Sequence, residues 1–266
     1  MADRVELLIV GGGKMGEALL GGLVSSGRNF SRIAVVEPVA QRRAELADRY
    51  GALGVQVATE VVPSDGAILA TKPDVIPDVA AAVGRVGTRR LLSIAAGVRL
   101  ATLTNAAGTE FGIVRAMPNT PALVSQGAAA ICGNDQATEA DLAWAEGILG
   151  AVGRVVRVPE YLMDAVTGLS GSGPAYVFLV AEAMIEAGVL MGLTRPVATE
   201  LANQTLLGAS TLLGEGRSPA DLRADVTSPG GTTAAGLREL ERHGVRAAFA
   251  AAIEAATARS AELGGQ

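Results

Sequence analysis

A short glycine-rich segment in the last quarter of the sequence has the residue types needed to hold a small anion. It reads Ser228-Pro229-Gly230-Gly231-Thr232-Thr233 and leads into a helical pattern over Ala234–His243. Backbone N–H groups at a helix N-terminus attract carboxylates, and paired glycines let a ligand come close to the backbone. We therefore expect this loop to hold a substrate carboxylate, with two threonine hydroxyls beside it. The alternative is a plain helix cap that follows a glycine turn.

A second glycine motif, near the start of the sequence, fits a dinucleotide. Gly11, Gly13 and Gly16 form G-x-G-x-x-G, with Lys14 and Met15 before the last glycine. The first glycine permits a tight turn, the second lets a pyrophosphate approach the backbone, and the third lets a helix pack closely on a strand. The motif follows an apolar strand pattern and opens an apolar helical pattern. We therefore expect a cofactor site rather than a purely structural turn.

Glu37 stands at the end of the second predicted strand, about 20 residues after the glycine motif, where an acid commonly accepts hydrogen bonds from the ribose hydroxyls of NAD. Its charge should repel the 2′-phosphate of NADP. Arg42 and Arg43 follow in a helical pattern and could help to hold such a phosphate. The sequence therefore leaves both NADH and NADPH open as cofactors, with a slight preference for NADH.

The elements that must position these residues alternate between strands and helices in the first half of the chain. Such alternation with short connections predicts a parallel sheet with helices on both faces. A helix should begin after Thr138, because Asp141 follows at the capping-box spacing. The strand patterns are Val5–Val10, Arg32–Glu37, Ala67–Ala70, Leu91–Ile94, Gly112–Arg115, Ala128–Cys132 and Val152–Val158, and the helical patterns include Met15–Ser26 and Gln41–Tyr50.

After about Pro159 the strand patterns stop and helical patterns continue. Cap residues followed by proline predict two helix starts, at Thr194-Arg195-Pro196 and at Ser218-Pro219. The first of these helices should reach about Glu215, and Gly244 should separate the last two, Ala234–His243 and Val245–Leu263. We therefore predict an α/β Rossmann domain with a parallel doubly wound sheet over residues 1–159. An all-α dimerisation domain should follow over residues 160–266.

Composition narrows the class of protein. The net charge is −5 with no basic block, so we expect no nucleic-acid partner. No apolar run reaches the roughly 18 residues of a membrane span, and the longest candidate, Ala175–Leu193, contains Glu182 and Glu186. We therefore expect no membrane partner. The first residues, Met1-Ala2-Asp3-Arg4, show no signal-peptide pattern, so the expected compartment is the cytoplasm.

The residues that most often form metal sites or catalytic dyads are scarce. Cys132 is the only cysteine, which excludes an internal disulfide and a cysteine-rich zinc site, and we interpret it as a small buried hydrophobe. His243 is the only histidine, and it stands before Gly244, where a helix C-terminal cap is the better interpretation. No metal site is expected.

Several further stretches, taken together, resemble one enzyme family over essentially the whole chain. In chain order after the glycine motif they are Ala70-Thr71-Lys72-Pro73, Ser93-Ile94-Ala95-Ala96-Gly97, Arg115-Ala116-Met117-Pro118-Asn119-Thr120-Pro121, Ser170-Gly171-Ser172-Gly173-Pro174-Ala175-Tyr176 and Ser228–Thr233. This set resembles pyrroline-5-carboxylate reductase, and the last motif is the most specific. The resemblance implies reduction of the C=N bond of 1-pyrroline-5-carboxylate by NAD(P)H, which gives L-proline. It also implies an intertwined dimer built from the C-terminal helices, which often assembles into larger rings.

The resemblance also implies roles for single residues. Thr233 matches the family position closest to the imine nitrogen. Lys72 follows a strand end, which favours a place near the nicotinamide or the substrate carboxylate, and the alternative is a solvated lysine in a loop. Family members that favour NADPH often carry small polar residues where this chain has Glu37-Pro38, which leaves cofactor preference open. The expected substrate residues are Val226, Ser228, Gly230, Gly231, Thr232 and Thr233. The expected cofactor residues are Gly11, Gly13, Lys14, Met15, Gly16, Glu37, Ala70, Thr71, Lys72, Pro73, Ala95, Ala96, Met117, Pro118 and Asn119.

Two other functions compete with this one. A β-hydroxyacid dehydrogenase would share the overall plan, but it uses a lysine of the helical domain as general base. The only lysines here are Lys14 and Lys72, both in the first domain, which argues against that chemistry. A non-enzymatic NAD(P)-binding redox sensor would keep the first glycine motif and would not need the second.

Overall fold

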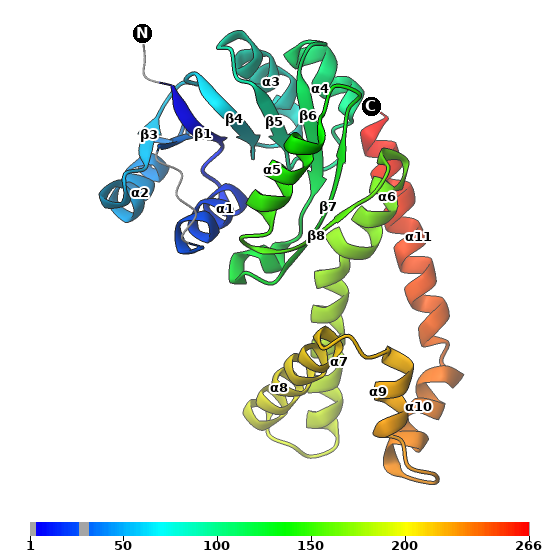
Figure 1. Ribbon diagram of the computed structural model, residues 1–266. Helices are drawn as coiled ribbons and strands as arrows, with labels where there is room; N and C mark the ends of the chain where they lie inside the picture. The colour runs from blue at the N-terminus through cyan, green and yellow to red at the C-terminus, as the bar shows by residue number, and fades with distance from the viewer. Residues whose placement is uncertain (1–3, 27–31, 266) are drawn as a thin grey trace. The chain divides into compact units, whose positions relative to one another are not determined.

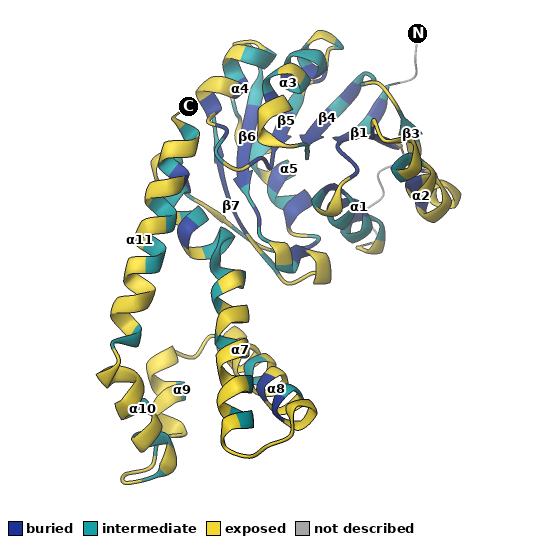
Figure 2. Cartoon of the chain, turned by 180° about the vertical axis from the view of Figure 1, so that it is seen from behind, coloured by how far each residue is buried: buried dark blue, intermediate teal, exposed yellow. Residues whose placement is uncertain are grey.

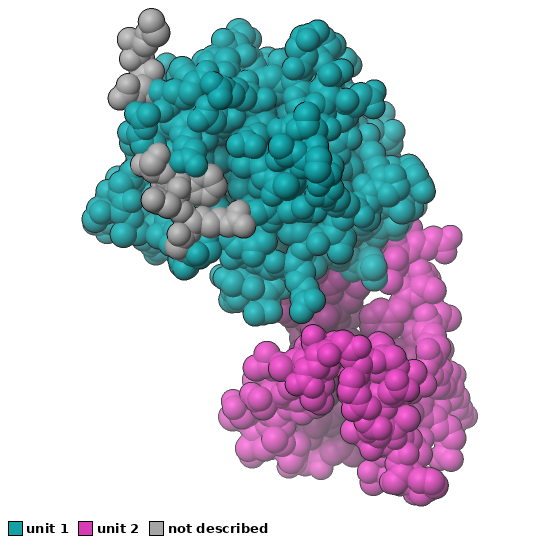
Figure 3. Space-filling view, in the orientation of Figure 1, with its two compact units in different colours: residues 1–172, 255–266 teal, residues 173–254 magenta. Residues whose placement is uncertain are grey.

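The protein, described here from a computed structural model, is defined for residues 4–26 and 32–265. Residues 1–3, on which the expected lack of a signal peptide partly rests, lie outside this part. The chain forms two compact units (Figure 3). Unit 1 holds the chain up to Ser172 and again from Ala255 onward, and unit 2 holds Gly173–Glu254.

Unit 1 is built on one eight-stranded sheet whose order is β3-β2-β1-β4-β5-β6-β7-β8 (Figure 1). The first six strands in this order have the Rossmann arrangement, in which a ligand crevice opens beside β1 at the carboxyl ends of the strands. The seven predicted strands all form, and β3 is additional. It has only three residues and no buried one, so it lacks the apolar run that marks the others. The bounds are β1 Val5–Val10, β2 Ile33–Val36, β3 Gln56–Ala58, β4 Ser64–Leu69, β5 Arg90–Ser93, β6 Gly112–Met117, β7 Gly127–Gly133 and β8 Gly153–Arg157.

One strand pair corrects the prediction of a wholly parallel sheet. β6 and β7 pair antiparallel, with Arg115 opposite Cys132, whereas the other neighbouring strands pair in parallel. A parallel crossover needs a dozen or more residues, usually including a helix. The loop that joins β6 to β7 is shorter than such a crossover and contains a 3₁₀ turn at Thr120–Val124. β7 therefore runs back beside β6 in the opposite direction.

Helices cover both faces of this sheet because the strand side chains alternate between two cores. Leu7 and Ile9 of β1 face one core, and Leu8 and Val10 face the other. α1, α2 and α5 contribute to the first core, and α3, α4 and α6 contribute to the second. The bounds are α1 Lys14–Ser25, α2 Ala40–Tyr50, α3 Ile76–Arg85, α4 Leu100–Ala107, α5 Glu139–Leu149 and α6 Met163–Val166. Thr138 and Asp141 form the predicted capping box of α5.

Unit 2 contains the helical part of the chain, in which the two helix starts predicted from a cap residue and proline are confirmed. Pro196 lies in the first turn of its helix, and Ser218 accepts a hydrogen bond from the Asp221 N–H. The third predicted start is late by two residues, because the helix after the glycine loop already begins at Thr232. The helices are α7 Gly173–Leu190, α8 Arg195–Gly214, α9 Pro219–Asp225, α10 Thr232–Arg242 and α11 Val245–Gly264, of which α11 ends in unit 1.

The helices of unit 2 are mostly exposed in the single chain (Figure 2), and their exposed residues include large apolar side chains. Only Ala198 and Ala202 of α8 are buried among the described residues of this unit. Phe178 and Leu179 of α7 and Leu207 of α8 are each more than three-fifths exposed. Apolar faces of this extent on a folded chain mark an interaction surface.

The division into units differs from the predicted boundary at residue 160. Met163 of α6 is fully buried in the second core of the sheet domain, so the chain stays in unit 1 beyond that residue. The C-terminal end of α11 joins the same unit, where the Ser260 hydroxyl lies 2.7 Å from a carboxylate oxygen of Asp164. These contacts join segments far apart in sequence, which a local pattern does not reveal.

One helical stretch, Glu160–Leu190, is long and apolar enough to cross a membrane by length and composition alone. The sequence pattern places the apolar helix at Ala175–Leu193, whereas the helical stretch begins earlier, and this adds Leu162, Met163 and Val166 to it. A helix that is buried against a second subunit has the same composition.

Candidate active site

The first glycine motif forms the connection between β1 and α1. Gly11 has φ +109°, and a Cβ atom there would lie 2.5 Å from the Ala70 carbonyl oxygen at the end of β4. A Cβ atom on Gly16 would collide with the Gly11 carbonyl oxygen. Glycine is therefore required at both places, at the first by conformation and contact and at the other by close packing.

The N-terminus of α1 is open to a ligand. Gly13 is the N-cap residue, and no side chain caps the helix. The first N–H groups of α1, those of Lys14, Met15 and Gly16, therefore lack a partner within the helix. A Cβ atom on Gly13 would meet nothing within 4 Å. Free N–H groups beside open space suit a pyrophosphate, so this turn fits the dinucleotide that the sequence predicts.

The segment after β4 reaches the same edge of the sheet. Thr71 follows Ala70 directly, and its Oγ1 atom is buried without a hydrogen-bond partner in the described structure. Native proteins rarely leave a buried hydroxyl unpaired, so this atom is a second local indication of a ligand. Lys72 is exposed, and its side chain forms no ion pair with any described residue. Pro73 begins a short 3₁₀ turn.

The Glu37 carboxylate, at the end of β2, holds the glycine motif. The side chain is buried, with an exposed fraction of 7% for the residue. One carboxylate oxygen accepts the Gly12 N–H at 3.0 Å, and the other accepts the Val39 N–H at 2.9 Å. Each carboxylate oxygen can accept a further hydrogen bond. Glu37 is therefore positioned by the backbone and can still accept bonds from ribose hydroxyls.

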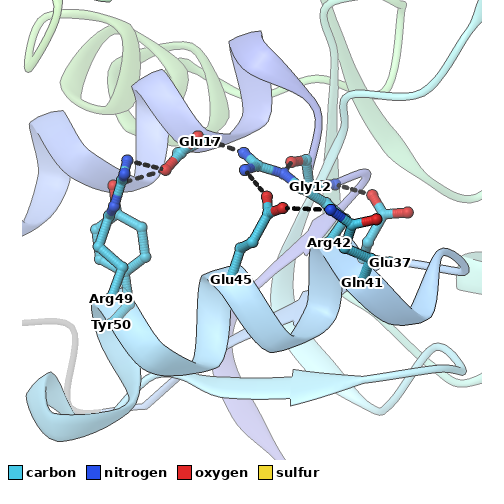
Figure 4. A network of polar contacts seen from close by, with 8 residues as sticks. All are labelled: Gly12, Glu17, Glu37, Gln41, Arg42, Glu45, Arg49 and Tyr50. Atoms are coloured by element: carbon cyan, nitrogen blue, oxygen red, sulfur yellow. Dashed lines mark hydrogen bonds and ion pairs between the residues drawn. The ribbon is translucent and has the colours of Figure 1, made fainter.

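Arg42 of α2 belongs to a polar network around Gly12 (Figure 4). Its Nε atom donates to the Gly12 carbonyl oxygen at 2.8 Å, and its two terminal nitrogens donate to the carboxylates of Glu17 and Glu45. The bond to Glu17 is the leading cause of a raised Arg42 pKa. Arg49 also donates to Glu17, at 2.6 Å. The sequence gives no signal for this network, because Gly12 is a variable position of the motif.

The segments after β5 and β6 lie at the same edge. Ala95 is buried in the second core, whereas Ala96 is exposed. Of the two predicted small residues, therefore, only Ala96 presents its side chain at the surface of unit 1. Met117 ends β6, and its Cε atom packs against Gly171. Pro118 follows and is buried.

Asn119 has a structural partner at each end of its amide. Its Oδ1 atom accepts the Ala128 N–H at 2.8 Å, and its Nδ2 atom donates to the Ser170 carbonyl oxygen at 3.1 Å. Ser170 lies in a π-helical turn, Thr167–Gly171, closed by a bond from the Ser172 N–H to the Thr167 carbonyl oxygen. Such turns occur frequently at functional sites. Asn119 thus joins the end of β6 to the start of the helical region.

The second glycine motif lies in unit 2, between α9 and α10. The Gly231 N–H donates to the Ser228 carbonyl oxygen at 3.0 Å across Pro229 and Gly230, and Gly230 has φ +71°. Proline followed by a glycine of positive φ is typical of a type II turn. The turn leads into α10, whose N-cap Gly231 carries no side-chain cap. Val226, at the end of α9, is 65% exposed.

This turn brings the predicted substrate residues together. Thr232 and Thr233 occupy the first turn of α10 rather than the loop before it. The N–H groups of that first turn lack intrahelical partners, as they do in α1. The loop therefore offers free backbone donors and two hydroxyls to an anion.

Two other residues behave as the sequence predicts. Cys132 is buried, and burial raises the pKa of its thiol to about 12, so it is a neutral apolar side chain rather than a nucleophile. His243 is the C-cap residue of α10. Within residues 4–26 and 32–265, no three His, Cys, Asp or Glu side chains are grouped to hold a metal ion.

Comparison with known proteins decides the family. Residues 160–263 match the family model described as pyrroline-5-carboxylate reductase dimerisation, and residues 6–97 match one described as NADP oxidoreductase, coenzyme F420-dependent. The chain is 45% identical to the pyrroline-5-carboxylate reductase of Synechocystis sp., over 98% of both chains. It is 41% identical to that of Mycobacterium leprae, over 99% of this chain and 98% of the relative.

The chain belongs to the pyrroline-5-carboxylate reductase family. A solved reductase structure from Coxiella burnetii superposes with a TM-score of 0.91 at 34% identity, over 98% of this chain and 99% of that one. A Plasmodium falciparum relative, solved with NADP bound, gives a TM-score of 0.83 at 30% identity, over 98% of each chain.

Family membership establishes the reaction. This reductase transfers a hydride from NAD(P)H to the C=N bond of 1-pyrroline-5-carboxylate and forms L-proline, the last step of proline biosynthesis. The resemblance drawn from the sequence is confirmed. The helical region is a dimerisation segment, which accounts for the uncovered apolar faces of α7 and α8. The β-hydroxyacid dehydrogenase and sensor alternatives are set aside.

Proposed function

We propose that the two glycine motifs divide the work of this reductase. The turn after β1 binds the pyrophosphate of NAD(P)H, and the turn before α10 binds the carboxylate of 1-pyrroline-5-carboxylate. One observation carries the substrate assignment: α10 begins at Thr232 without a side-chain cap, directly after the turn at Pro229-Gly230. The free N–H groups there match the geometry that a carboxylate needs.

The cofactor supplies the hydride that reduces the imine carbon. The protein's contribution is to hold the ring and control the proton on its nitrogen. We assign to Ser228, Gly230, Gly231 and Thr232 the grip on the carboxylate, and to exposed Val226 an apolar contact with the ring. Thr233 orients the imine nitrogen or relays a proton to it, which converts the product nitrogen to an amine.

Lys72 has the second proposed catalytic role. It is exposed at the carboxyl end of β4, and no carboxylate of the described chain neutralises it. Its charge favours an anionic ligand, either the substrate carboxylate or a cofactor phosphate. Loss of this charge should weaken binding more than it slows hydride transfer.

The remaining cofactor residues surround the same edge of the sheet. The unpaired hydroxyl of Thr71 donates a hydrogen bond to the cofactor, and the small side chain of Ala96 leaves room for the flat nicotinamide ring. Ala95 contributes only its backbone, because its methyl group lies in the core. Asn119 supports the nicotinamide side indirectly, since both ends of its amide bond to the backbone. The other members of this set are Gly11, Gly13, Lys14, Met15, Gly16, Glu37, Ala70, Pro73, Met117 and Pro118.

The proposal extends to the setting of the enzyme. Residues 1–159 act as the cofactor domain, and residues 160–266 act as the substrate and dimerisation domain, in keeping with the dimerisation model over 160–263. Dimers assemble further into rings, and the enzyme works in the cytoplasm without nucleic-acid or membrane partners. Mass measurement in solution tests the assembly.

The test of the site assignment is a turnover assay with a matched pair of variants. Oxidation of NADH and NADPH is followed with 1-pyrroline-5-carboxylate, and proline is identified as product. We expect Thr233→Ala to lower kcat by about a hundredfold or more, while the dissociation constant for NADH stays unchanged. Thr233→Ser keeps the hydroxyl and should retain most of the activity. Wild-type turnover by Thr233→Ala would remove this residue from the mechanism.

A further inference from the structure

Each of the three nitrogens of the Arg42 guanidinium group donates a hydrogen bond to a group of its own chain. The acceptors are a backbone carbonyl of the glycine motif and two carboxylates, Glu17 on α1 and Glu45 on α2. Only 25% of the side chain is exposed. An arginine held in this way would have to break charge-assisted bonds before it could reach a ligand phosphate.

The same arginine completes a clamp on the glycine motif. The N–H of Gly12 donates to Glu37, and the carbonyl of Gly12 accepts from Arg42, so the two peptide groups that flank Gly12 are both fixed. Side-chain packing supports this clamp, because a Cβ atom on Gly12 would lie 2.5 Å from a methyl carbon of Leu46. The conformation of the cofactor turn therefore depends on side chains from β2 and α2 as well as on its glycines.

Within the polar network around Gly12, the charges are unfavourable for the 2′-phosphate of NADPH. The network holds three carboxylates, Glu17, Glu37 and Glu45, against two guanidinium groups, Arg42 and Arg49. Glu37 forms no ion pair with any cation in the described part of the chain, so its charge is not neutralised there. A 2′-phosphate carries up to two negative charges and would meet this carboxylate directly, at a cost that like charges normally incur.

Arg43 is the remaining cation at the end of β2. It donates to the backbone carbonyls of Glu37 and Pro38, at 3.0 and 2.7 Å, through a single terminal nitrogen. It therefore braces the strand end and contacts no carboxylate through these bonds. This makes Arg43 a natural control for Arg42, since both are arginines of the first turn of α2.

We propose that Arg42 is a positioning residue of the cofactor turn rather than a phosphate ligand, and that its sequestration beside Glu37 makes this reductase prefer NADH to NADPH. This inference rests on the proposed function, in which the turn after β1 binds the cofactor. It names a role for Arg42 that the motif itself does not contain. It also predicts how preference and affinity can be separated experimentally.

Binding of NADH and NADPH to the full-length protein, measured by calorimetry without substrate, tests the proposal. We expect the wild type to bind NADH about tenfold or more tightly than NADPH. Arg42→Met should weaken both cofactors by a similar factor of about ten, because it loosens the turn that both share. Its KM for NADH should rise while kcat changes little. Arg43→Met should change either affinity by only about twofold or less.

A second pair of variants keeps the test informative if Arg42→Met folds poorly. Glu45 is exposed and, among the residues that the structure describes, its side chain bonds to Arg42 and Gln41 alone. Glu45→Gln should therefore fold and bind both cofactors slightly more weakly, with the ratio of the two affinities unchanged. Glu37→Ser should instead move the ratio toward NADPH by removing the opposing charge. A selective loss of NADPH affinity in Arg42→Met, or tighter NADPH binding by the wild type, would overturn the proposal.

These binding results are independent of the substrate assignment. A protein that shows the expected affinities but loses no turnover in Thr233→Ala would retain the role of Arg42 and lose that of Thr233. A protein with normal proline formation and the opposite cofactor pattern would lose the inference alone.

Discussion

The two turns of this reductase are both rich in glycine, but their surroundings differ. Each leads into an uncapped helix N-terminus, α1 in one case and α10 in the other. The first is packed from several sides: Gly11 against Ala70, Gly12 against Leu46, and Gly16 against Gly11. In the second turn, a Cβ atom on Gly230 would meet no atom within 4 Å, and the atoms nearest to one on Gly231 would belong to Ser228.

This difference indicates where each turn obtains its shape. The cofactor turn is built completely by unit 1, with a buried carboxylate and an arginine fixing its peptides. The substrate turn is shaped locally by proline and glycine, and it belongs to unit 2, in which α7 and α8 leave large apolar side chains uncovered in the single chain. We expect the second turn to become competent only when a partner subunit covers those side chains, whereas the first needs no partner.

The largest expected effect comes from breaking the dimer. Phe178→Glu places a charge on α7, where the phenylalanine is 63% exposed in the single chain. Burying an unpaired charge in an interface costs several kcal/mol, so we expect monomers by light scattering and almost complete loss of turnover. NADH binding should persist, because its turn belongs to unit 1.

The matched control for that variant is Leu53→Glu. Leu53 lies in unit 1 and is 60% exposed, so it is an equally exposed apolar residue outside the dimerisation segment. This variant should remain dimeric and active. Full activity in monomeric Phe178→Glu would show that the substrate turn works within one subunit and would end the contrast between the two turns.

The same contrast explains which parts of this architecture could be predicted from the sequence. Local signals worked well: β1 begins and ends where its apolar run does, and Thr138 and Asp141 cap α5 as their spacing predicts. The antiparallel β6–β7 pair follows from the short loop that joins these two strands, whereas the hydrogen bond between Ser260 and Asp164 joins segments far apart in sequence. No period or cap encodes such contacts, which is why the compact units divide the chain at other residues than the domain boundary predicted at residue 160.

The candidate site divides in the same way. The sequence identified the glycines, Glu37 and the Ser228–Thr233 motif, because residue type and spacing alone indicate their chemistry. The sequence did not reveal the hydrogen bond from Arg42 to Gly12 or the one from Asn119 to Ser170. Both use a side chain to bind a backbone carbonyl, and every residue has a carbonyl, so sequence alone offers no pattern for them.

Alanine at one glycine of each region gives the next largest effect and compares their packing. Gly16→Ala puts a methyl group against the Gly11 carbonyl oxygen and should cost about 1–3 kcal/mol of unfolding free energy, with weaker NADH binding. Gly236, in α10, meets nothing within 4 Å of an added Cβ. There, alanine should stabilise the helix by about 0.5–1 kcal/mol.

Thermal or urea unfolding of both variants checks the signs. If Gly236→Ala lowers the free energy of unfolding and also leaves a folded monomer, the added methyl group must clash with the partner subunit. That result would place this face of α10 in the interface. A neutral Gly16→Ala would mean that the cofactor turn can relax, contrary to its tight packing.

The smallest expected effect concerns the rate of thiol labelling, and it separates protection by the chain itself from protection by a partner. Burial raises the pKa of Cys132 to about 12, and the thiolate is the reactive form. Iodoacetamide should therefore label native Cys132 very slowly in monomer and dimer alike. Leu207→Cys, placed in a Cys132→Ser background, adds a thiol on α8 at a position that is 62% exposed in the single chain. That thiol should react readily when Phe178→Glu keeps the protein monomeric and more slowly in the dimer.

The pH dependence of labelling tests the direction in which burial shifts the pKa of the Cys132 thiol. The folded state favours the neutral thiol. Below the ordinary thiol pKa of about 8.5, the thiol is neutral in both the folded and the unfolded state, so it does not change the stability of the fold. Above that pH, unfolding releases a proton and the folded state loses stability. Labelling of native Cys132 should therefore keep rising with pH beyond the range where a free thiol levels off. A plateau near the ordinary pKa would show that unit 1 opens around β7, and that its protection is weaker than its packing indicates.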